Sequence, residues 1–157
     1  MLYCCGNKLK EGRKCKVIEI RDRVRFVETD MMGVVHHANY LRWFEMGRVA
    51  YLRAAGVELL NLMNDGYLFP ITEVSCNYKN SARFDEEFVI RTTMLEFSKV
   101  KMTFGYRIVR TKDEMLLATG KTTNAFTNLE GRPTRLPISY YEKIACLYGQ
   151  EEKGRKE

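Results

Sequence analysis

The chain has 157 residues, of which 45% are hydrophobic and 11% aromatic, and this suits one domain with a substantial core. It has no run of 18 apolar residues and no N-terminal apolar stretch of signal-peptide length, so we expect no membrane insertion and a cytoplasmic location. The formal net charge is +6, but residues 1–16 hold five Lys and Arg against one Glu, so most of the excess lies there. We interpret this segment as a solvated basic tail, and no motif supports nucleic-acid binding.

The five cysteines are irregularly spaced, which is not typical of a disulfide framework. Reduced thiols are the simpler interpretation, and they agree with a cytoplasmic location. Cys4, Cys5 and Cys15 contain no C-x-x-C pair and have no His nearby, so we expect no metal site.

The first half of the chain predicts one strand and one long helix. In residues 17–28 apolar and charged side chains alternate, a period of two that is typical of a strand with one buried face. Residues 37–55 are apolar around most of a helix circumference, which predicts a long buried helix. Gly47 in its middle indicates a close packing partner, and Gly56 is the expected C-terminal stop.

Strand patterns dominate the rest of the chain, between a short helix or loop at residues 58–66 and a terminal helix at 137–148. The four expected strands cover residues 69–78, 87–97, 100–110 and 114–128. A run of strands after one helix predicts an α+β fold with an antiparallel sheet around that helix. We therefore divide the chain into a tail (1–16), one domain (17–150) and a second tail (151–157). Dimerisation would cover the open edge of such a sheet.

Asp30 lies between the first strand and the long helix. The first N–H groups of a helix are unpaired and partially positive, so they can polarise a carbonyl oxygen docked there. A carboxylate just upstream can attack the carbonyl carbon or activate a water, and Gly33 lets the backbone approach a ligand. This pattern fits acyl transfer or hydrolysis, although the commoner role of an Asp at this place is to cap the helix. His36 and His37 would face different directions on a helix, which disfavours a shared metal site.

Residues 24–53, VRFVETDMMGVVHHANYLRWFEMGRVAYLR, resemble the start of the 4-hydroxybenzoyl-CoA thioesterase family, including its Tol-Pal-associated acyl-CoA thioesterase branch. The family pattern is an Asp, two variable residues, Gly-x-Val, two residues often His or Tyr, x-Asn-Tyr and an aromatic–acidic pair. It falls here on Asp30, Gly33, Val35, His36, His37, Asn39, Tyr40, Phe44 and Glu45. The later block CNYKNSARFDE, residues 76–86, also resembles the family, so the likeness covers residues 17–148.

The resemblance implies a hotdog fold, in which an antiparallel sheet of about five strands wraps one long central helix. It also implies a homodimer or homotetramer with active sites at the subunit interface. The implied reaction is hydrolysis of an acyl-CoA thioester to a carboxylic acid and CoA, without a cofactor.

The resemblance also assigns residues to the site. Asp30 would act as nucleophile or general base, and the backbone N–H of His37 would polarise the thioester carbonyl. Substrate-binding residues are expected at Gly33, Glu28, Tyr40, Lys99 and Lys101. The two lysines would contact CoA phosphates, but exposed lysines at a hairpin also serve solubility alone.

Several alternatives stay open. Glu45 is a rival catalytic carboxylate, because related hotdog subfamilies place their acid mid-helix, but it could instead pair with Arg42 or Arg48. The two Met residues after Asp30 replace smaller residues of some relatives, which leaves the acyl preference open. The substrate could also be an acyl carrier protein, which the net positive charge suits. The protein could instead bind acyl-CoA without catalysis, with Asp30 only capping the helix.

Overall fold

The structure is a computed structural model that describes residues 7–9 and 13–149 and consists mainly of one antiparallel sheet and one long helix. Its main strands are β3 (Val17–Arg23), β4 (Ile71–Tyr78), β5 (Glu87–Phe97), β6 (Lys101–Arg110) and β7 (Leu116–Ala125). Its helices are α1 (His37–Ala54), α2 (Leu59–Asn64), α3 (Ile138–Tyr148) and the 3-10 turn η1 (Phe26–Glu28). The sheet order is β3-β5-β6-β7-β4, with every neighbouring pair antiparallel, so the predicted α+β architecture is confirmed.

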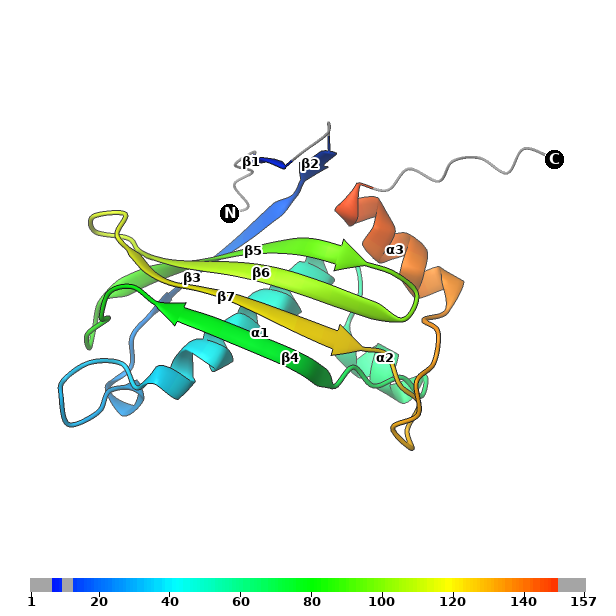
Figure 1. Ribbon diagram of the computed structural model, residues 1–157, viewed down its shortest axis with the longest axis horizontal. Coiled ribbons are helices and arrows are strands. Elements are labelled where there is room, and N and C mark those ends of the chain that lie inside the picture. The colour runs from blue at the N-terminus through cyan, green and yellow to red at the C-terminus, as the bar shows by residue number, and fades with distance from the viewer. Residues whose placement is uncertain (1–6, 10–12, 150–157) are drawn as a thin grey trace.

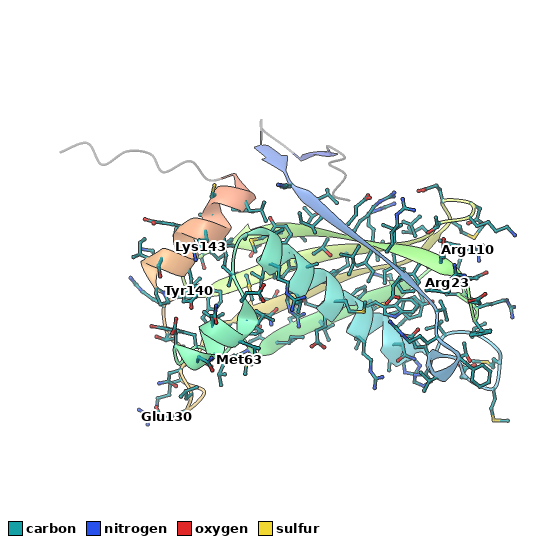
Figure 2. All side chains as sticks on the ribbon, turned by 180° about the vertical axis from the view of Figure 1, so that it is seen from behind. Arg23, Met63, Arg110, Glu130, Tyr140 and Lys143 are labelled. Atoms are coloured by element: carbon teal, nitrogen blue, oxygen red, sulfur yellow. The ribbon has the colours of Figure 1, made fainter. Side chains whose placement is uncertain are left out.

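Helix α1 lies across one face of this sheet (Figure 1), and it stands in front of the strands when the molecule is seen from behind (Figure 2). The contact is close at two glycines. A methyl group on Gly47 would overlap the Thr92 hydroxyl and lie 2.9 Å from Ile90 Cγ2. A methyl group on Gly120 would overlap the ring of Phe44. The close packing partner expected from Gly47 is therefore confirmed, and the helix cannot shift along the sheet without a clash.

The first strand is shorter than the sequence pattern predicts. It ends at Arg23, and the chain then turns through η1. The turn forms because the Glu28 carboxylate accepts a hydrogen bond from the Arg25 N–H, at 2.8 Å. Phe26, which the alternation placed in the core, is 76% exposed. The predicted strand over residues 24–28 is therefore wrong.

The other elements lie close to their predicted positions. α1 ends one residue early, and Gly56 beyond it has the left-handed φ of +80° expected at a helix stop. β4 begins at Ile71, since Pro70 before it has no N–H to donate to the sheet. β7 begins at Leu116, beyond a left-handed residue at Glu114 with φ of 56°.

Part of the expected N-terminal tail has regular structure. β1 (Asn7–Leu9) and β2 (Arg13–Cys15) form an antiparallel pair. Residues 151–157 and the side chains of the three N-terminal cysteines lie outside the described part of the chain. Within that part, no helix has the length and apolarity to cross a bilayer. The same residues contain no group of three or more His, Cys, Asp or Glu side chains that could hold a metal.

Candidate active site

Asp30 lies in a tight loop whose two ends are paired with each other. Thr29 and Val35 form an antiparallel bridge, and inside it the Asp30 N–H donates to the Val34 carbonyl, at 2.9 Å. Gly33 takes the left-handed φ of +75°, which favours glycine. The Met32 N–H donates to Asp30 Oδ1 at 2.8 Å, whereas Oδ2 forms no hydrogen bond with any described residue. The loop thus orients the carboxylate and leaves one of its oxygens free.

The start of α1 is capped by a histidine. The Nδ1 atom of His36 accepts a hydrogen bond from the Ala38 N–H, at 3.2 Å. The interpretation of Asp30 as the helix cap is therefore wrong. Among the described residues, no acceptor binds the N–H of His37, the first residue of the helix. This leaves a free donor at the partially positive end of α1.

Glu28 is a buried carboxylate that joins the loop to the helix. It is 7% exposed, and its Oε1 accepts from the Trp43 indole N–H at 3.0 Å. Its backbone carbonyl accepts from the His36 N–H at 2.9 Å and from the Asn39 side chain at 2.8 Å. Glu28 does not line the pocket beside Asp30, although the sequence suggested it as a pocket residue. Its contacts join the Asp30 loop to helix α1, which is a structural role.

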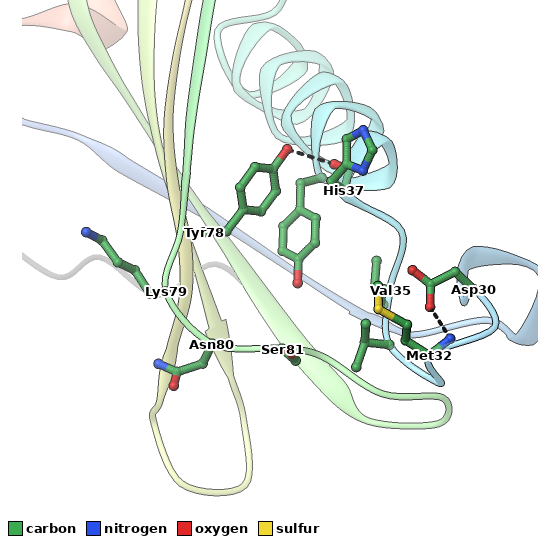
Figure 3. A pocket seen from close by; sticks show the side chains of 10 residues that line it. Asp30, Met32, Val35, His37, Tyr78, Lys79, Asn80 and Ser81 are labelled. Carbon is green, nitrogen blue, oxygen red and sulfur yellow. Dashed lines mark hydrogen bonds between the residues drawn. The ribbon is translucent and has the colours of Figure 1, made fainter.

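A pocket of about 290 Å³ lies beside Asp30. Its lining residues are Asp30, Met32, Val34, Val35, His37, Tyr40, Tyr78, Lys79, Asn80 and Ser81. One wall is the Asp30 loop with the start of α1, and the other is the end of β4 with the chain that follows it (Figure 3). The structure thus brings Asp30, His37 and Tyr40 together. Met32 is mostly exposed and Met31 fully exposed, so this side of the pocket is open to solvent.

The second wall, residues 78–81, was missed by the sequence reasoning. Its signal was present, because these residues lie within the later block that resembles the thioesterase family. The alternation that predicts a strand does not tell which end of α1 the last residue of that strand will contact. The sheet register supplies that information, since Tyr78 pairs with Ala118 and Ala118 with Ile108, near the end of β6.

The phenols of Tyr78 and Tyr40 and the thiol of Cys76 are protonated at neutral pH. Burial, together with the neighbouring Cys76 and Tyr40, raises the pKa of the Tyr78 phenol to about 12. Burial also raises the pKa of Tyr40 and that of the Cys76 thiol. At neutral pH the Cys76 thiol therefore stays protonated, which argues against a nucleophilic thiolate here. Asp30 is left as the carboxylate of the pocket.

Lys99 and Lys101 lie far from this pocket within one chain. The pocket is level with Ile108 of β6, whereas Lys101 begins that strand, a separation of about 20 Å along it. The Lys99 ammonium lies 5.4 Å from the centre of the Tyr141 ring of α3, at the other end of the sheet (Figure 1). Lys101 pairs with Glu96 at 3.1 Å. The structure does not bring the two lysines together with Asp30.

Glu45 also stays outside the pocket. Its side chain is exposed on α1 and forms no ion pair with any described residue, Arg42 and Arg48 included. Arg48 is instead buried, and its Nε and Nη1 atoms have no hydrogen-bond partner in the described structure.

Comparison with known proteins agrees with this architecture. Residues 24–144 match the family described as the Thioesterase-like superfamily. YneP of Bacillus subtilis, provisionally named an acyl-CoA thioesterase, is 29% identical over 85% of this chain and 94% of that protein. YbgC of Escherichia coli, named an acyl-CoA thioester hydrolase, is 28% identical over 74% of this chain and 87% of that protein. The crystal structure of the hypothetical protein TT1821 from Thermus thermophilus superposes with a TM-score of 0.79 at 34% identity, covering 85% of this chain and 99% of that one. The fold is thus the predicted hotdog fold.

Replacing Glu28 by Gln should destabilise the protein. The amide offers one acceptor where two N–H donors, those of Trp43 and Arg25, now bind the carboxylate. One buried donor then loses its partner, so the free energy of unfolding should fall by about 1–3 kcal/mol, measured by urea denaturation. The matched control is Glu45→Gln, on the exposed face of α1, which should change it by less than about 0.5 kcal/mol. Full stability with lost activity in Glu28→Gln would instead assign Glu28 to the substrate.

Proposed function

The chain belongs to the thioesterase-like superfamily, and we propose that it hydrolyses an acyl-CoA thioester to a carboxylic acid and CoA in the pocket beside Asp30. One observation carries the proposal. A carboxylate with a free oxygen and a helix N-terminus with a free N–H meet at the same pocket. Relatives whose names specify acyl-CoA thioesters support the choice of substrate class.

The proposed chemistry divides the work between Asp30 and His37. The thioester carbonyl oxygen accepts a hydrogen bond from the His37 N–H, where the helix dipole stabilises the negative charge that develops on it. The free oxygen of Asp30 either attacks the carbonyl carbon or takes a proton from an attacking water. The carbon–sulfur bond then breaks, and the leaving sulfur takes up a proton to give CoA thiol. Where water attacks, Asp30 passes on the proton of that water; where Asp30 attacks, an acyl–Asp30 anhydride remains, which a water then hydrolyses to the acid and the Asp30 carboxylate. Each route consumes one water and gives the same acid and the same thiol.

The pocket volume supports an acyl group inside and CoA outside. At about 290 Å³ it lies at the small end of ligand pockets, which cover about 300–1,000 Å³. A whole CoA ester is larger than this, so only its acyl end fits between the two walls. Within the superfamily we place the chain with the 4-hydroxybenzoyl-CoA thioesterases and their Tol-Pal-associated branch, because the pattern from Asp30 to Glu45 matches theirs.

A second copy of the chain would complete this enzyme. β4 pairs only with β7, so its other edge is unpaired in the described chain. Ile71, Val74 and Tyr78 are about half exposed, and their partners on β7 share the sheet face that packs on α1. A long edge strand with apolar side chains pairs readily with another strand. We therefore propose a homo-oligomer in which two copies meet at β4.

Replacing Asp30 by Asn should abolish thioester hydrolysis. The amide keeps the size of the side chain and its hydrogen bond from Met32 but cannot attack or remove a proton. We expect kcat to fall by about 10²–10⁴-fold for every acyl-CoA that the parent protein cleaves. A thiol reagent would follow CoA release over a panel of short, long and aromatic acyl-CoAs, with matched acyl-carrier-protein esters beside it.

Two variants serve as controls for this prediction. Glu45→Gln changes the carboxylate of α1, and Cys76→Ala removes the thiol beside Tyr78, and each should keep kcat within about threefold of the parent value. A larger loss in Glu45→Gln than in Asp30→Asn would reassign the catalytic carboxylate. Parent protein that binds acyl-CoA without turnover would contradict hydrolysis, and faster cleavage of the carrier-protein esters would change the substrate.

Lys79 should contribute to CoA recognition more than the hairpin lysines do. It lies in the second wall of the pocket, and its exposed side chain points outward from that wall (Figure 3), on the side where the CoA part of the substrate would lie. Lys79→Ala should raise KM for an acyl-CoA by about fivefold with little change in kcat, since one charged contact to a phosphate is worth about 1 kcal/mol. Steady-state kinetics of Lys99→Ala and Lys101→Ala provide the comparison. A larger KM effect at these two positions would place the phosphates at the β5–β6 hairpin.

Charge on the β4 edge should separate the copies. Val74→Arg puts a cation on the exposed apolar strip of β4, where a second copy would have to bury it. Sedimentation velocity should then detect monomers where the parent protein sediments as an oligomer. Val100→Arg, at a half-exposed valine in the β5–β6 turn, is the matched control and should leave assembly unchanged. Oligomers in both variants would place the interface elsewhere.

A further inference from the structure

The two walls of the pocket come from segments that are far apart in the sequence, and they are joined at two points. At the loop side, the Val35 N–H donates to the Ala82 carbonyl at 2.8 Å. At the helix side, the Tyr78 hydroxyl donates to the His37 carbonyl at 3.0 Å (Figure 3). The first link is between backbone atoms and withstands any side-chain change. The second depends on one hydroxyl group on an edge strand.

The ring of Tyr78 is placed by aromatic neighbours. It meets the Tyr40 ring edge-on, with centroids 5.1 Å apart, and the His37 ring edge-on at 6.5 Å. Edge-to-face pairs of this kind fix the ring orientation independently of the hydroxyl. Because its pKa is raised to about 12, the phenol keeps its proton at neutral pH and can only donate to the carbonyl. A phenylalanine at this position would keep the ring contacts and lose the link to His37, together with the contact between the hydroxyl and the Cys76 thiol, which Cys76→Ala removes by itself.

The Tyr78 hydroxyl binds His37, the same residue whose N–H has no acceptor among the described residues. The His37 carbonyl also lies within the first turn of α1, where Leu41 supplies the helical hydrogen bond. The bond from Tyr78 is therefore not needed to form the helix. It ties the first turn to the sheet and limits rotation of the peptide groups on either side of His37.

We infer that Tyr78 is a positioning residue, whose hydroxyl holds the first turn of α1 so that the His37 N–H and the Asp30 carboxylate address one acyl group. This inference rests on the proposed thioester hydrolysis. Misplacing a polarising donor by a fraction of an ångström affects the transition state more than the bound substrate. The hydroxyl should therefore affect kcat and leave KM nearly unchanged.

Tyr78→Phe tests the inference with the full-length protein. We expect kcat for a cleaved acyl-CoA to fall by about 10- to 100-fold, with KM within twofold and an unfolding midpoint close to that of the parent. Hydrogen exchange should become faster at the hydrogen-bonded amides within residues 37–41, such as those of Ala38 and Asn39. The matched control is Tyr140→Phe, which removes a hydroxyl that donates to Asp65 at 2.5 Å, at the opposite end of the sheet (Figure 2). It should leave kcat and the exchange of residues 37–41 unchanged.

Each other outcome overturns the inference. A raised KM with unchanged kcat would show that the hydroxyl binds substrate. A kcat loss matched by a lowered unfolding midpoint would show a general structural role, and unchanged kinetics would show no role. Parent protein without thioesterase activity would contradict the proposed function, whereas the hydrogen-exchange comparison would still test whether Tyr78 holds the helix start.

Discussion

The buried carboxylate of Glu28 holds the Asp30 loop and the helix in a fixed relation. A buried anion is tolerated only where hydrogen bonds replace its lost hydration, and here the Trp43 indole and the Arg25 N–H supply them. The same residue binds His36 and Asn39 through its carbonyl. The chain therefore enters and leaves the Asp30 loop at one anchored point. The direction of the Asp30 carboxylate and the exposure of the His37 N–H both depend on that anchor.

The centre and the edge of the sheet support different parts of the site. Its centre, β5 and β6, is buried against α1 and fixes the helix through contacts such as that at Gly47, where no side chain fits. Its edge, β4, pairs on one side only and carries Tyr78 at the wall of the pocket. The loop of the proposed catalytic carboxylate is joined through Glu28 to the helix that this centre holds. The opposite wall rests on the part that is open to another chain.

Much of the fold could be predicted, because each strand of the sheet and each end of α1 has a local signal. Alternation gave the strands, and Gly56 marked the end of the helix. The same alternation failed at Phe26 and Glu28, where the order of exposed and buried is reversed. The cause lies outside the local pattern, in the indole of Trp43 fifteen residues later. No period of two or of 3.6 carries that information.

The site could be predicted only in part for the same reason. Asp30, His37 and Tyr40 belong to one continuous segment, so a motif reveals them together. The wall around Tyr78 is brought to them by the register of three strands, β4, β7 and β6. Capping was an open alternative for Asp30, since Asp is a common cap, but His36 takes this role through its imidazole nitrogen.

The open side of the pocket has a consequence for how such an enzyme can diverge. Met31 and Met32 flank the carboxylate, yet both project into solvent and support none of the core. Substitution of Met32 alters the lining of the pocket, and substitution of either residue leaves the free energy of folding nearly untouched. The lining of the pocket can therefore change at Met32 while the contacts of Glu28, Gly47 and Gly120 stay as they are. Stability and the shape of the acyl end of the proposed site are thus set by different residues.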